Sequence, residues 1–183
     1  MSIGQFNKDL AQKQNIGINE SGIYKGEITS AIEKVYDSGA ESITFNFKAD
    51  DGSTAKFMQI FTIKKDGTAA FGYNQVQSLM GLLEIRNAEP KSHDDNLNYD
   101  CFCNRKIALG LQRVNTPGDK YQFRMNIVNF FDYNTLQTYA EKTNNQPAKT
   151  QDRKINDTTD TSKQGKQQQQ NAPINTTNDD LPF

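Results

Sequence analysis

Side chains that could bind a metal or act in catalysis are few in this sequence. His93 is the only histidine, and Cys101 and Cys103 follow it with a single residue between them. Structural zinc sites usually take cysteines with about two to four residues between them, so we favour a cysteine packed in a strand and a solvated His93. The pairs Asp50-Asp51 and Asp94-Asp95 lie in turn sequences, where aspartate caps backbone amides. We therefore expect no enzyme activity, no metal and no cofactor.

Aromatic and basic side chains around Asp51-Gly52 indicate a different kind of site. A two-residue hairpin turn here predicts three pairs: Lys48 with Ala55, Asn46 with Phe57, and Thr44 with Gln59. One face of the hairpin then carries a set of apolar residues suited to a core: Ile43, Phe45, Phe47, Met58 and Ile60. The other face carries Phe57, Gln59 and Phe61 beside Lys48. Phe57 and Phe61 are our first choice for stacking bases of a nucleic acid.

Two alternatives to base stacking stay open for Phe57 and Phe61. Both rings could pack under a loop or against a second subunit. A turn of odd length with a bulge would also shift the register and exchange the two faces of the hairpin. Five further aromatic residues are reserves that the sequence does not rank: Tyr73, Tyr99, Phe102, Tyr121 and Phe130.

Basic residues are numerous, but they are balanced by acidic ones. The net charge is −1, which counts against a nucleic-acid-binding protein, and a protein that coats duplex DNA usually has a larger basic excess. A single strand needs only one basic groove that follows its phosphates, together with aromatic faces for its bases. Besides Lys48, we expect Lys56, Arg105 and Lys106 to contribute to such a groove. The alternative is that these cations are ordinary solvated strand ends, and charge alone favours it.

The order of predicted elements is three strands, a helix and two strands. The strands are expected at 23–36, 42–48, 54–64, 100–114 and 120–131, the helix at 74–83 with Asn74 as its N-cap, and a short closing helix at 135–142. A polar loop is expected at 87–98. This order is that of the OB-fold, a five-stranded barrel with one helix between strands 3 and 4. The sequence therefore predicts a mainly β, OB-fold-like domain over residues 22–140, after an N-terminal extension of residues 1–21.

The C-terminal part has a different composition. Between Glu141 and Asn178 the only large apolar residues are Ile155 and Ile174, in a background of Gln, Asn, Thr, Lys and Asp. Such a segment buries too little apolar surface to offset the entropy of ordering it. We predict a disordered linker over residues 141–178. The tip at 179–183 is distinct, because it combines two carboxylates with a terminal aromatic ring.

The tip has the sequence Asp179-Asp180-Leu181-Pro182-Phe183. An aromatic residue at the end of a polar tail fits a pocket of another protein. The tip, the polar linker and the OB-like order together resemble the bacterial single-stranded DNA-binding proteins, in a divergent form such as phages and mobile elements carry. The chain departs from the housekeeping form in its N-terminal strand, so the family's tetramer is in doubt and a homo-oligomer stays open.

The resemblance implies a function and a place. It implies a protein that binds single-stranded DNA in the cytoplasm of a bacterial host and recruits replication, recombination or repair proteins through the tip. An adaptor that competes for those partners without binding DNA is the alternative, and an RNA-binding OB protein is a third reading. The sequence has no apolar run near the length of about 18 residues that a membrane helix needs, so we expect no membrane association.

Overall fold

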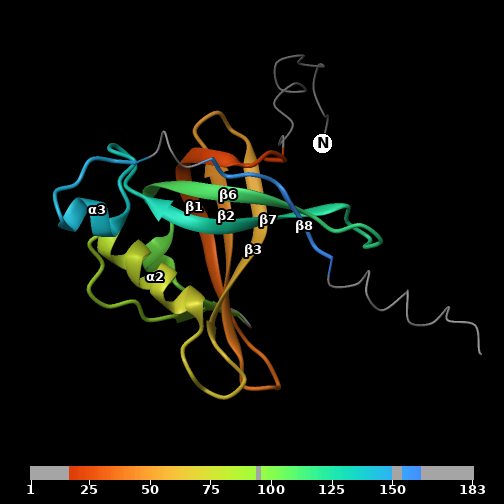
Figure 1. Ribbon diagram of the computed structural model, residues 1–183. Coiled ribbons are helices and arrows are strands. Elements are labelled where there is room, and N and C mark those ends of the chain that lie inside the picture. The colour runs from red at the N-terminus through yellow and green to blue at the C-terminus, as the bar shows by residue number, and fades with distance from the viewer. Residues whose placement is uncertain (1–16, 94–95, 150–153, 162–183) are drawn as a thin grey trace, which may run out of the picture.

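The structure is a computed structural model that describes residues 17–93, 96–149 and 154–161. It is mainly β, with an antiparallel sheet and few helices (Figure 1), so the predicted class is confirmed. The strands are β1 (Gly22–Val35), β2 (Glu41–Ala49), β3 (Thr54–Ile63), β4 (Lys91–His93), β5 (Asn96–Asn98), β6 (Lys106–Asn115), β7 (Phe123–Phe131) and β8 (Thr158–Thr159). The helices are α2 (Phe71–Leu82), α3 (Tyr139–Thr143) and the 3₁₀ turn η1 (Asp100–Phe102).

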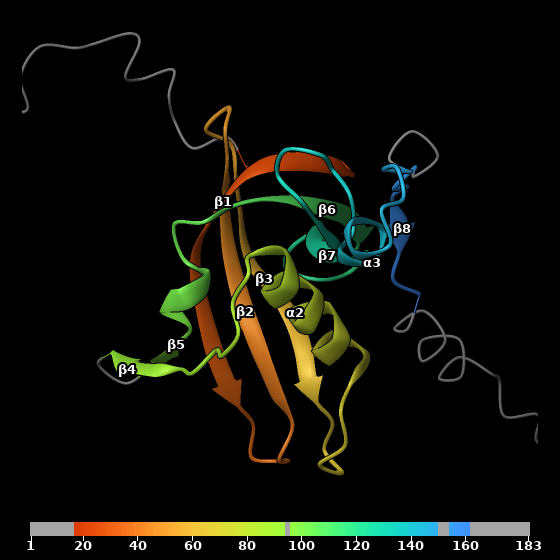
Figure 2. The same cartoon turned by 90° about the vertical axis from the view of Figure 1, so that its left-hand side faces the viewer.

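The central strand of the sheet is β1. The five long strands follow the order β3-β2-β1-β6-β7, and each neighbouring pair is antiparallel. With 14 residues, β1 is long enough to pair with β6 from Gly22 to Glu27 and with the short β5 at Ile32 and Glu33. In Figure 2 the three strands β1, β2 and β3 run side by side, α2 packs against them, and the β4–β5 hairpin lies beyond β1.

The sheet is open between β3 and β7, so the predicted closed five-stranded barrel is not found. The two strands lie close together, but no hydrogen-bonded pairing joins them within the described residues. The helix α2 contacts both strands there. Its Gln75 Nε2 donates to the Val128 carbonyl of β7 at 3.0 Å. Gly72 approaches β3 so closely that a Cβ atom would lie 2.2 Å from the Phe61 carbonyl oxygen, so the helix packs between the two strands where barrel closure would otherwise pair them.

The helix α2 begins earlier than the sequence predicts. One side of α2 faces the core, where Val76, Leu79 and the C-cap residue Leu83 are buried. The predicted N-cap at Asn74 is wrong, since the cap is Ala70 and it makes no side-chain hydrogen bond. The close approach of Gly72 to β3 explains the difference, because a residue without a side chain lets the first turn pack against the strand.

The predicted strand at 100–114 is shorter in the structure. Residues Asp100–Phe102 form η1, and β6 begins only at Lys106. Asn104 separates them with a φ of 58°, and its N–H donates to the Ile28 carbonyl of β1 at 2.8 Å. The predicted loop at 87–98 contains the β4–β5 hairpin. The closing helix α3 begins at Tyr139 because Thr138 caps it, with the Thr138 and Glu141 side chains each bonded to the other residue's backbone.

The folded part extends past both predicted boundaries of 22–140. Ile18 is buried, and its N–H donates to the Thr54 carbonyl at 2.8 Å. Within the predicted linker, β8 pairs in parallel with β6, near the first residue of β1. Ile155 approaches Gly110 of β6, where a Cβ atom would lie 3.1 Å from its Cδ1. The remainder of the linker from residue 162 and the tip Asp179 to Phe183 lie outside the described residues.

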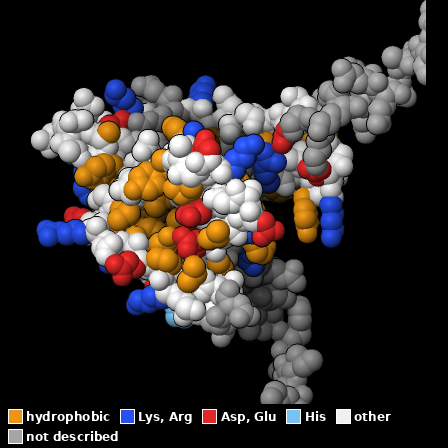
Figure 3. Space-filling view, turned by 90° about the horizontal axis from the view of Figure 1, so that it is seen from below, with side chains coloured by type: hydrophobic (Ala, Val, Ile, Leu, Met, Phe, Trp, Pro, Cys, Tyr) orange, Lys and Arg blue, Asp and Glu red, His pale blue; other side chains and the backbone are white. Residues whose placement is uncertain are grey.

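The surface seen in Figure 3 mixes apolar, acidic and basic side chains. Among the described residues, no helix has the length and apolar character needed to cross a membrane.

Candidate nucleic-acid interface

The β2–β3 hairpin follows the predicted register in its middle and departs from it near the turn. Thr44 pairs with Gln59 as predicted, whereas Lys48 pairs with Thr54 instead of Ala55. The cause is a bulge opposite Asn46, between the pairs of Phe45 and Phe47. The turn is also longer than two residues, because the Ala49 N–H donates to the Ser53 carbonyl at 2.8 Å. The predicted pairing is therefore wrong on the turn side of the bulge.

Phe57 lies in this bulge with a φ of 59°, a left-handed conformation that is uncommon for a bulky residue. Its N–H donates to Asn46 Oδ1 at 2.8 Å, and Asn46 Nδ2 in turn donates to Ser30 Oγ at 2.8 Å. The bulge breaks the alternation of β3, so that Lys56 and Phe57 are both exposed although they are consecutive. Bulges commonly redirect a side chain in this way next to functional sites.

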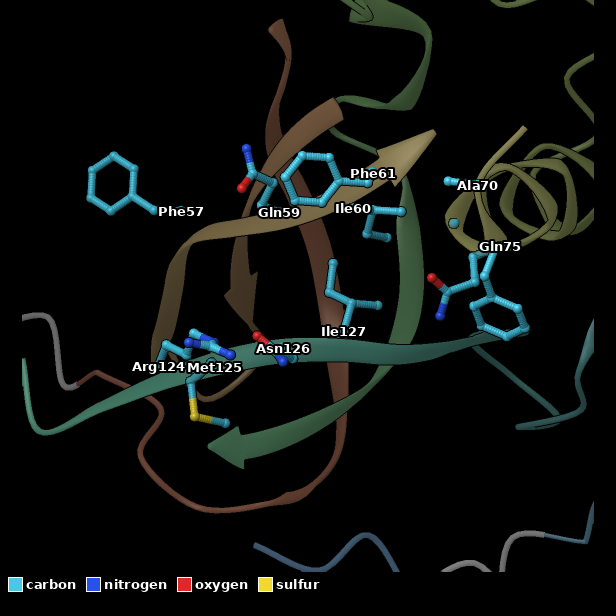
Figure 4. A pocket seen from close by; sticks show the side chains of 12 residues that line it. Phe57, Gln59, Ile60, Phe61, Ala70, Gln75, Arg124, Met125, Asn126 and Ile127 are labelled. Atoms are coloured by element: carbon cyan, nitrogen blue, oxygen red, sulfur yellow. The ribbon is translucent and has the colours of Figure 1, made fainter. Parts of the chain in front are cut away.

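The predicted division of the hairpin into two faces is confirmed. Met58 and Ile60 are buried, while the Phe57 side is open, with 78% of this residue and 47% of Phe61 exposed. Figure 4 shows Phe57, Gln59 and Phe61 projecting from one side of β3. We call Phe57, Gln59 and Phe61, together with the exposed Lys48 of β2, the aromatic face. Its role in binding stays a prediction.

Two grooves adjoin the aromatic face, and both are lined by residues of β3 and β7. The first runs from Phe57 and Phe61 to Phe71 and Gln75 of α2. The second runs from Phe57 and Lys56 to Tyr121, in the connection between β6 and β7. The two grooves share Phe57, Arg124 and Met125. Phe57 therefore stands at the centre of a continuous depression with exposed aromatic rings at both ends.

The cations near this depression differ in their partners. Lys48 and Lys56 take part in none of the ion pairs found in the described part of the chain. Arg124, which the sequence analysis did not select, lines both grooves and pairs with Asp160 at 3.1 Å. Both lysines are therefore free to approach a phosphate, whereas Arg124 would first exchange a carboxylate.

The other two predicted cations are engaged elsewhere. Arg105 Nη1 donates to the Leu83 carbonyl at the end of α2, at 3.0 Å. Lys106 Nζ lies 2.8 Å from Asp50 Oδ1 and 4.0 Å from Glu27 Oε2. The hydrogen bond from Lys106 lowers the pKa of Asp50, and the same bond raises the pKa of Lys106. The structure therefore does not bring Arg105 and Lys106 to the grooves as free charges.

The reserve aromatic residues fall into three groups. Phe102 and Phe130 are core residues with no exposed surface. Tyr99 is half-buried and donates to Glu33 Oε1 at 2.7 Å, and burial together with this bond raises its pKa. Tyr121 and Tyr73 are exposed, and only Tyr121 lines one of the two grooves.

The sequence analysis missed one aromatic residue that contacts the face directly. The Tyr36 ring stacks on Phe61, with centroids 5.8 Å apart and 27° between the planes. Its place at the end of the first predicted strand, two residues after Lys34, was the only signal for it. In the sequence, a tyrosine at this position indicates only where a strand ends. The contact with β3 depends on the fold, which places Tyr36 beside that strand.

The residues with metal-ligating side chains do not converge in the described ranges. His93 Nε2 lies 2.9 Å from Asp100 Oδ2, and both side chains are substantially exposed. Cys101 and Cys103 are free and half-buried, and burial raises the pKa of both thiols. Contrary to the prediction, neither lies in a strand, because η1 and its cap hold them. Asp94 and Asp95 lie outside the described residues, and no group of three potential ligands occurs among the described ones.

No protein-family model matches the sequence, and no curated protein matches it.

Proposed function

We propose that this protein binds single-stranded DNA, without enzymatic activity, on an open OB-like domain. Support for the OB-like interpretation comes from the strand order β3-β2-β1-β6-β7, with α2 between the third and fourth long strands. That order and helix position are those of the OB-fold, whose binding surface centres on its second and third strands. The open seam beside α2 is the departure from a closed barrel.

The observation that carries the proposal is the aromatic face. Phe57 and Phe61 are four residues apart on one strand, which separates them by roughly 13 Å. Large aromatic side chains exposed together on one strand mark an interaction site, and nucleobases stack on such rings whatever their sequence. Lys48 and Lys56 lie beside them without a carboxylate partner among the described ion pairs. Rings for bases and free ammonium groups for phosphates are the two components of sequence-tolerant binding to a single strand.

Titration with single-stranded DNA tests this function. The full chain is titrated with a dT oligomer, a ribo-oligomer of the same length and a duplex, each at several salt concentrations. We expect preference for the dT oligomer and a linear fall of log affinity with log salt, with a slope of about −0.7 for each phosphate contact. Preference for the ribo-oligomer would favour an RNA-binding OB protein. Absence of binding to all three would leave the adaptor that acts through its tip.

Recruitment through the tip is the second part of the proposal. The Phe183 ring suits an apolar pocket, its α-carboxylate suits an Arg or Lys, and Asp179 and Asp180 suit a basic rim. Deletion of 179–183 is expected to abolish capture of replication, recombination or repair proteins while the affinity for the dT oligomer stays equal or rises. A lower DNA affinity after this deletion would contradict a tip that serves only partners.

A further inference from the structure

Tyr36 is held in place from several sides immediately after β1. Its N–H donates to the Ala40 carbonyl at 2.9 Å, and its own carbonyl accepts from the Gly39 N–H at 2.8 Å. The Tyr36 hydroxyl bonds to Gln59 Nε2, and its ring stacks on Phe61. The single side chain of Tyr36, just after β1, thus contacts both Gln59 and Phe61 of β3.

The strands place a lysine in the same cross-strand row. Lys34 of β1 pairs with Ser42 of β2, and Ser42 pairs with Phe61 of β3. Paired residues of neighbouring strands point to the same side of a sheet, so Lys34 and Phe61 share the outer face. Lys34 Nζ lies 4.7 Å from the centre of the Tyr36 ring, and it belongs to none of the described ion pairs.

This row is packed although it faces outward. Ser42 at its centre has no exposed surface, and its Oγ lies 2.9 Å from Gln59 Nε2. Tyr36 covers one side of the Phe61 ring, which is consistent with Phe61 being less exposed than Phe57. By contrast, no ring among the described residues stacks on Phe57. Phe61 therefore has a fixed orientation before any ligand arrives, while Phe57 depends on its backbone alone.

We propose that Tyr36 is a positioning residue that presents the free side of the Phe61 ring to a base, and that Lys34 binds the phosphate next to that base. This inference rests on the proposed binding of single-stranded DNA and deepens it by assigning one nucleotide position. A platform that is already oriented loses less side-chain entropy on binding, so its affinity depends on the residue that orients it.

A double-mutant cycle tests the positioning role. Tyr36→Ala is expected to lower the affinity for a dT oligomer about threefold to tenfold, and to have almost no effect when Phe61→Ala is already present. Tyr36→Phe, which keeps the stack and removes the bond to Gln59, is expected to lose about threefold or less. Equal losses with and without Phe61 would overturn the positioning role, because the two residues would then act independently.

Lys34→Gln tests the phosphate contact through the salt dependence of binding, which a change in packing alone does not alter. The slope of log affinity against log salt is expected to become shallower by about 0.7, the amount for one phosphate contact with a single strand. Tyr73→Ala and Lys91→Gln are the matched controls, since both residues are exposed and lie outside the cross-strand row of Lys34, Ser42 and Phe61. An unchanged slope would overturn the Lys34 assignment. Thermal unfolding of each variant separates a loss of affinity from a loss of folding.

The outcomes for this inference and for the proposed function are distinct. If the wild-type chain binds the dT oligomer and the Tyr36 and Lys34 variants bind it equally well, only the inference fails. If the wild-type chain does not bind at all, both fail.

Discussion

Two regions on the same side of the sheet contain similar side chains and differ in whether their lysines are paired with a carboxylate. The aromatic face has exposed rings, and Lys48 and Lys56 beside it make none of the described ion pairs. The other region, which we call the paired patch, consists of Lys25, Asp50, Lys106 and Tyr133. Both lysines lie over the Tyr133 ring at 5.4 and 5.8 Å, while Asp50 bonds to Lys106 and to the Tyr133 hydroxyl.

The difference depends on a carboxylate rather than on the number of cations. Lys48 of β2 pairs with Glu27 of β1, and Glu27 pairs with Lys106 of β6, so the two regions are neighbours on one face. Both lysines therefore have Glu27 as a cross-strand neighbour. Lys106 alone also has Asp50 at hydrogen-bond distance, 2.8 Å from its Nζ atom. A phosphate arriving there would compete with an existing ion pair, whereas at Lys48 and Lys56 it would not. The aromatic face is therefore expected to bind a single strand and the paired patch to remain inactive.

Removing rings gives the largest expected difference between the two regions. Phe57→Ala and Phe61→Ala are each expected to weaken binding of a dT oligomer by about 1–3 kcal/mol, or roughly fivefold to 150-fold, because each removes a surface for base stacking. Tyr133→Ala removes a ring from the paired patch and is expected to change affinity less than twofold. Fluorescence anisotropy of a labelled oligomer measures all three. Comparable losses in the two regions would remove the distinction between them.

Removing cations gives a smaller difference with a separate readout. Lys48→Gln and Lys56→Gln are each expected to reduce the magnitude of the salt slope by about 0.7 and to weaken binding severalfold. Lys106→Gln leaves the slope unchanged, because the ammonium group is already paired with Asp50. The slopes come from titrations between low and physiological salt. A change at Lys106 equal to that at Lys48 would show that the ion pair opens readily for phosphate.

Neutralising Asp50 would remove the close carboxylate partner of Lys106, so that the lysine of the paired patch resembles the unpaired lysines of the aromatic face. Asp50→Asn leaves Lys106 with only the more distant Glu27, so the affinity for a dT oligomer is expected to rise about threefold through a more positive local field. The test is the same titration with the wild-type chain and the variant at several pH values.

The ratio of the Asp50→Asn affinity to the wild-type affinity depends on the ionisation of Asp50 in the wild-type chain. Lys106 and Tyr133 hold the pKa of Asp50 below its ordinary value of 3.8 by hydrogen bonding. A lowered pKa means that the stabilising ion pair is complete above the ordinary value and is lost only as the pH falls through the pKa of the folded protein. The ratio of the two affinities is therefore expected to stay constant from pH 8 to pH 5. A ratio that already shrinks near pH 6 would contradict the lowered pKa.

The sequence predicts the two faces of the β2–β3 hairpin because alternation depends only on local order. Met58 and Ile60 are buried and Phe61 is exposed as expected, and Thr44 pairs with Gln59. The bulge at Phe57 could not be predicted in this way, because no residue type in the segment indicates that a phenylalanine adopts a positive φ. The open seam is likewise a tertiary effect, which depends on Gly72 meeting the Phe61 carbonyl and Gln75 reaching Val128.

Charges are harder to predict than faces because pairing joins distant segments. Lys106 and Asp50 are 56 residues apart in the chain, and Arg124 and Asp160 are 36 apart. From the sequence Lys106 and Lys48 are equivalent cations, and the register of β1 also places both beside Glu27. Only the hydrogen bond from Lys106 to Asp50 distinguishes them. Tyr36 is missed for the same reason, since its partners Gln59 and Phe61 belong to another strand.

The smallest expected effect concerns the backbone of Phe57, and it tests whether the aromatic face is strained. A residue with a side chain loses about 1–2 kcal/mol in the left-handed conformation, whereas glycine loses about 0.5–1 kcal/mol of chain entropy instead. Phe57→Gly is therefore expected to be about 0.5 kcal/mol more stable to urea unfolding than Phe57→Ala, although neither retains the ring. Therefore the prediction at Phe57 needs a control in the same bulge.

The adjacent bulge residue Lys56 is the matched control, because it is not among the described residues with positive φ. At Lys56 the order should reverse, with the glycine variant less stable than the alanine variant by about 0.5–1 kcal/mol. The same order at both positions would mean that Phe57 carries no conformational strain, and the bulge would then serve packing around Asn46 rather than the presentation of an aromatic ring.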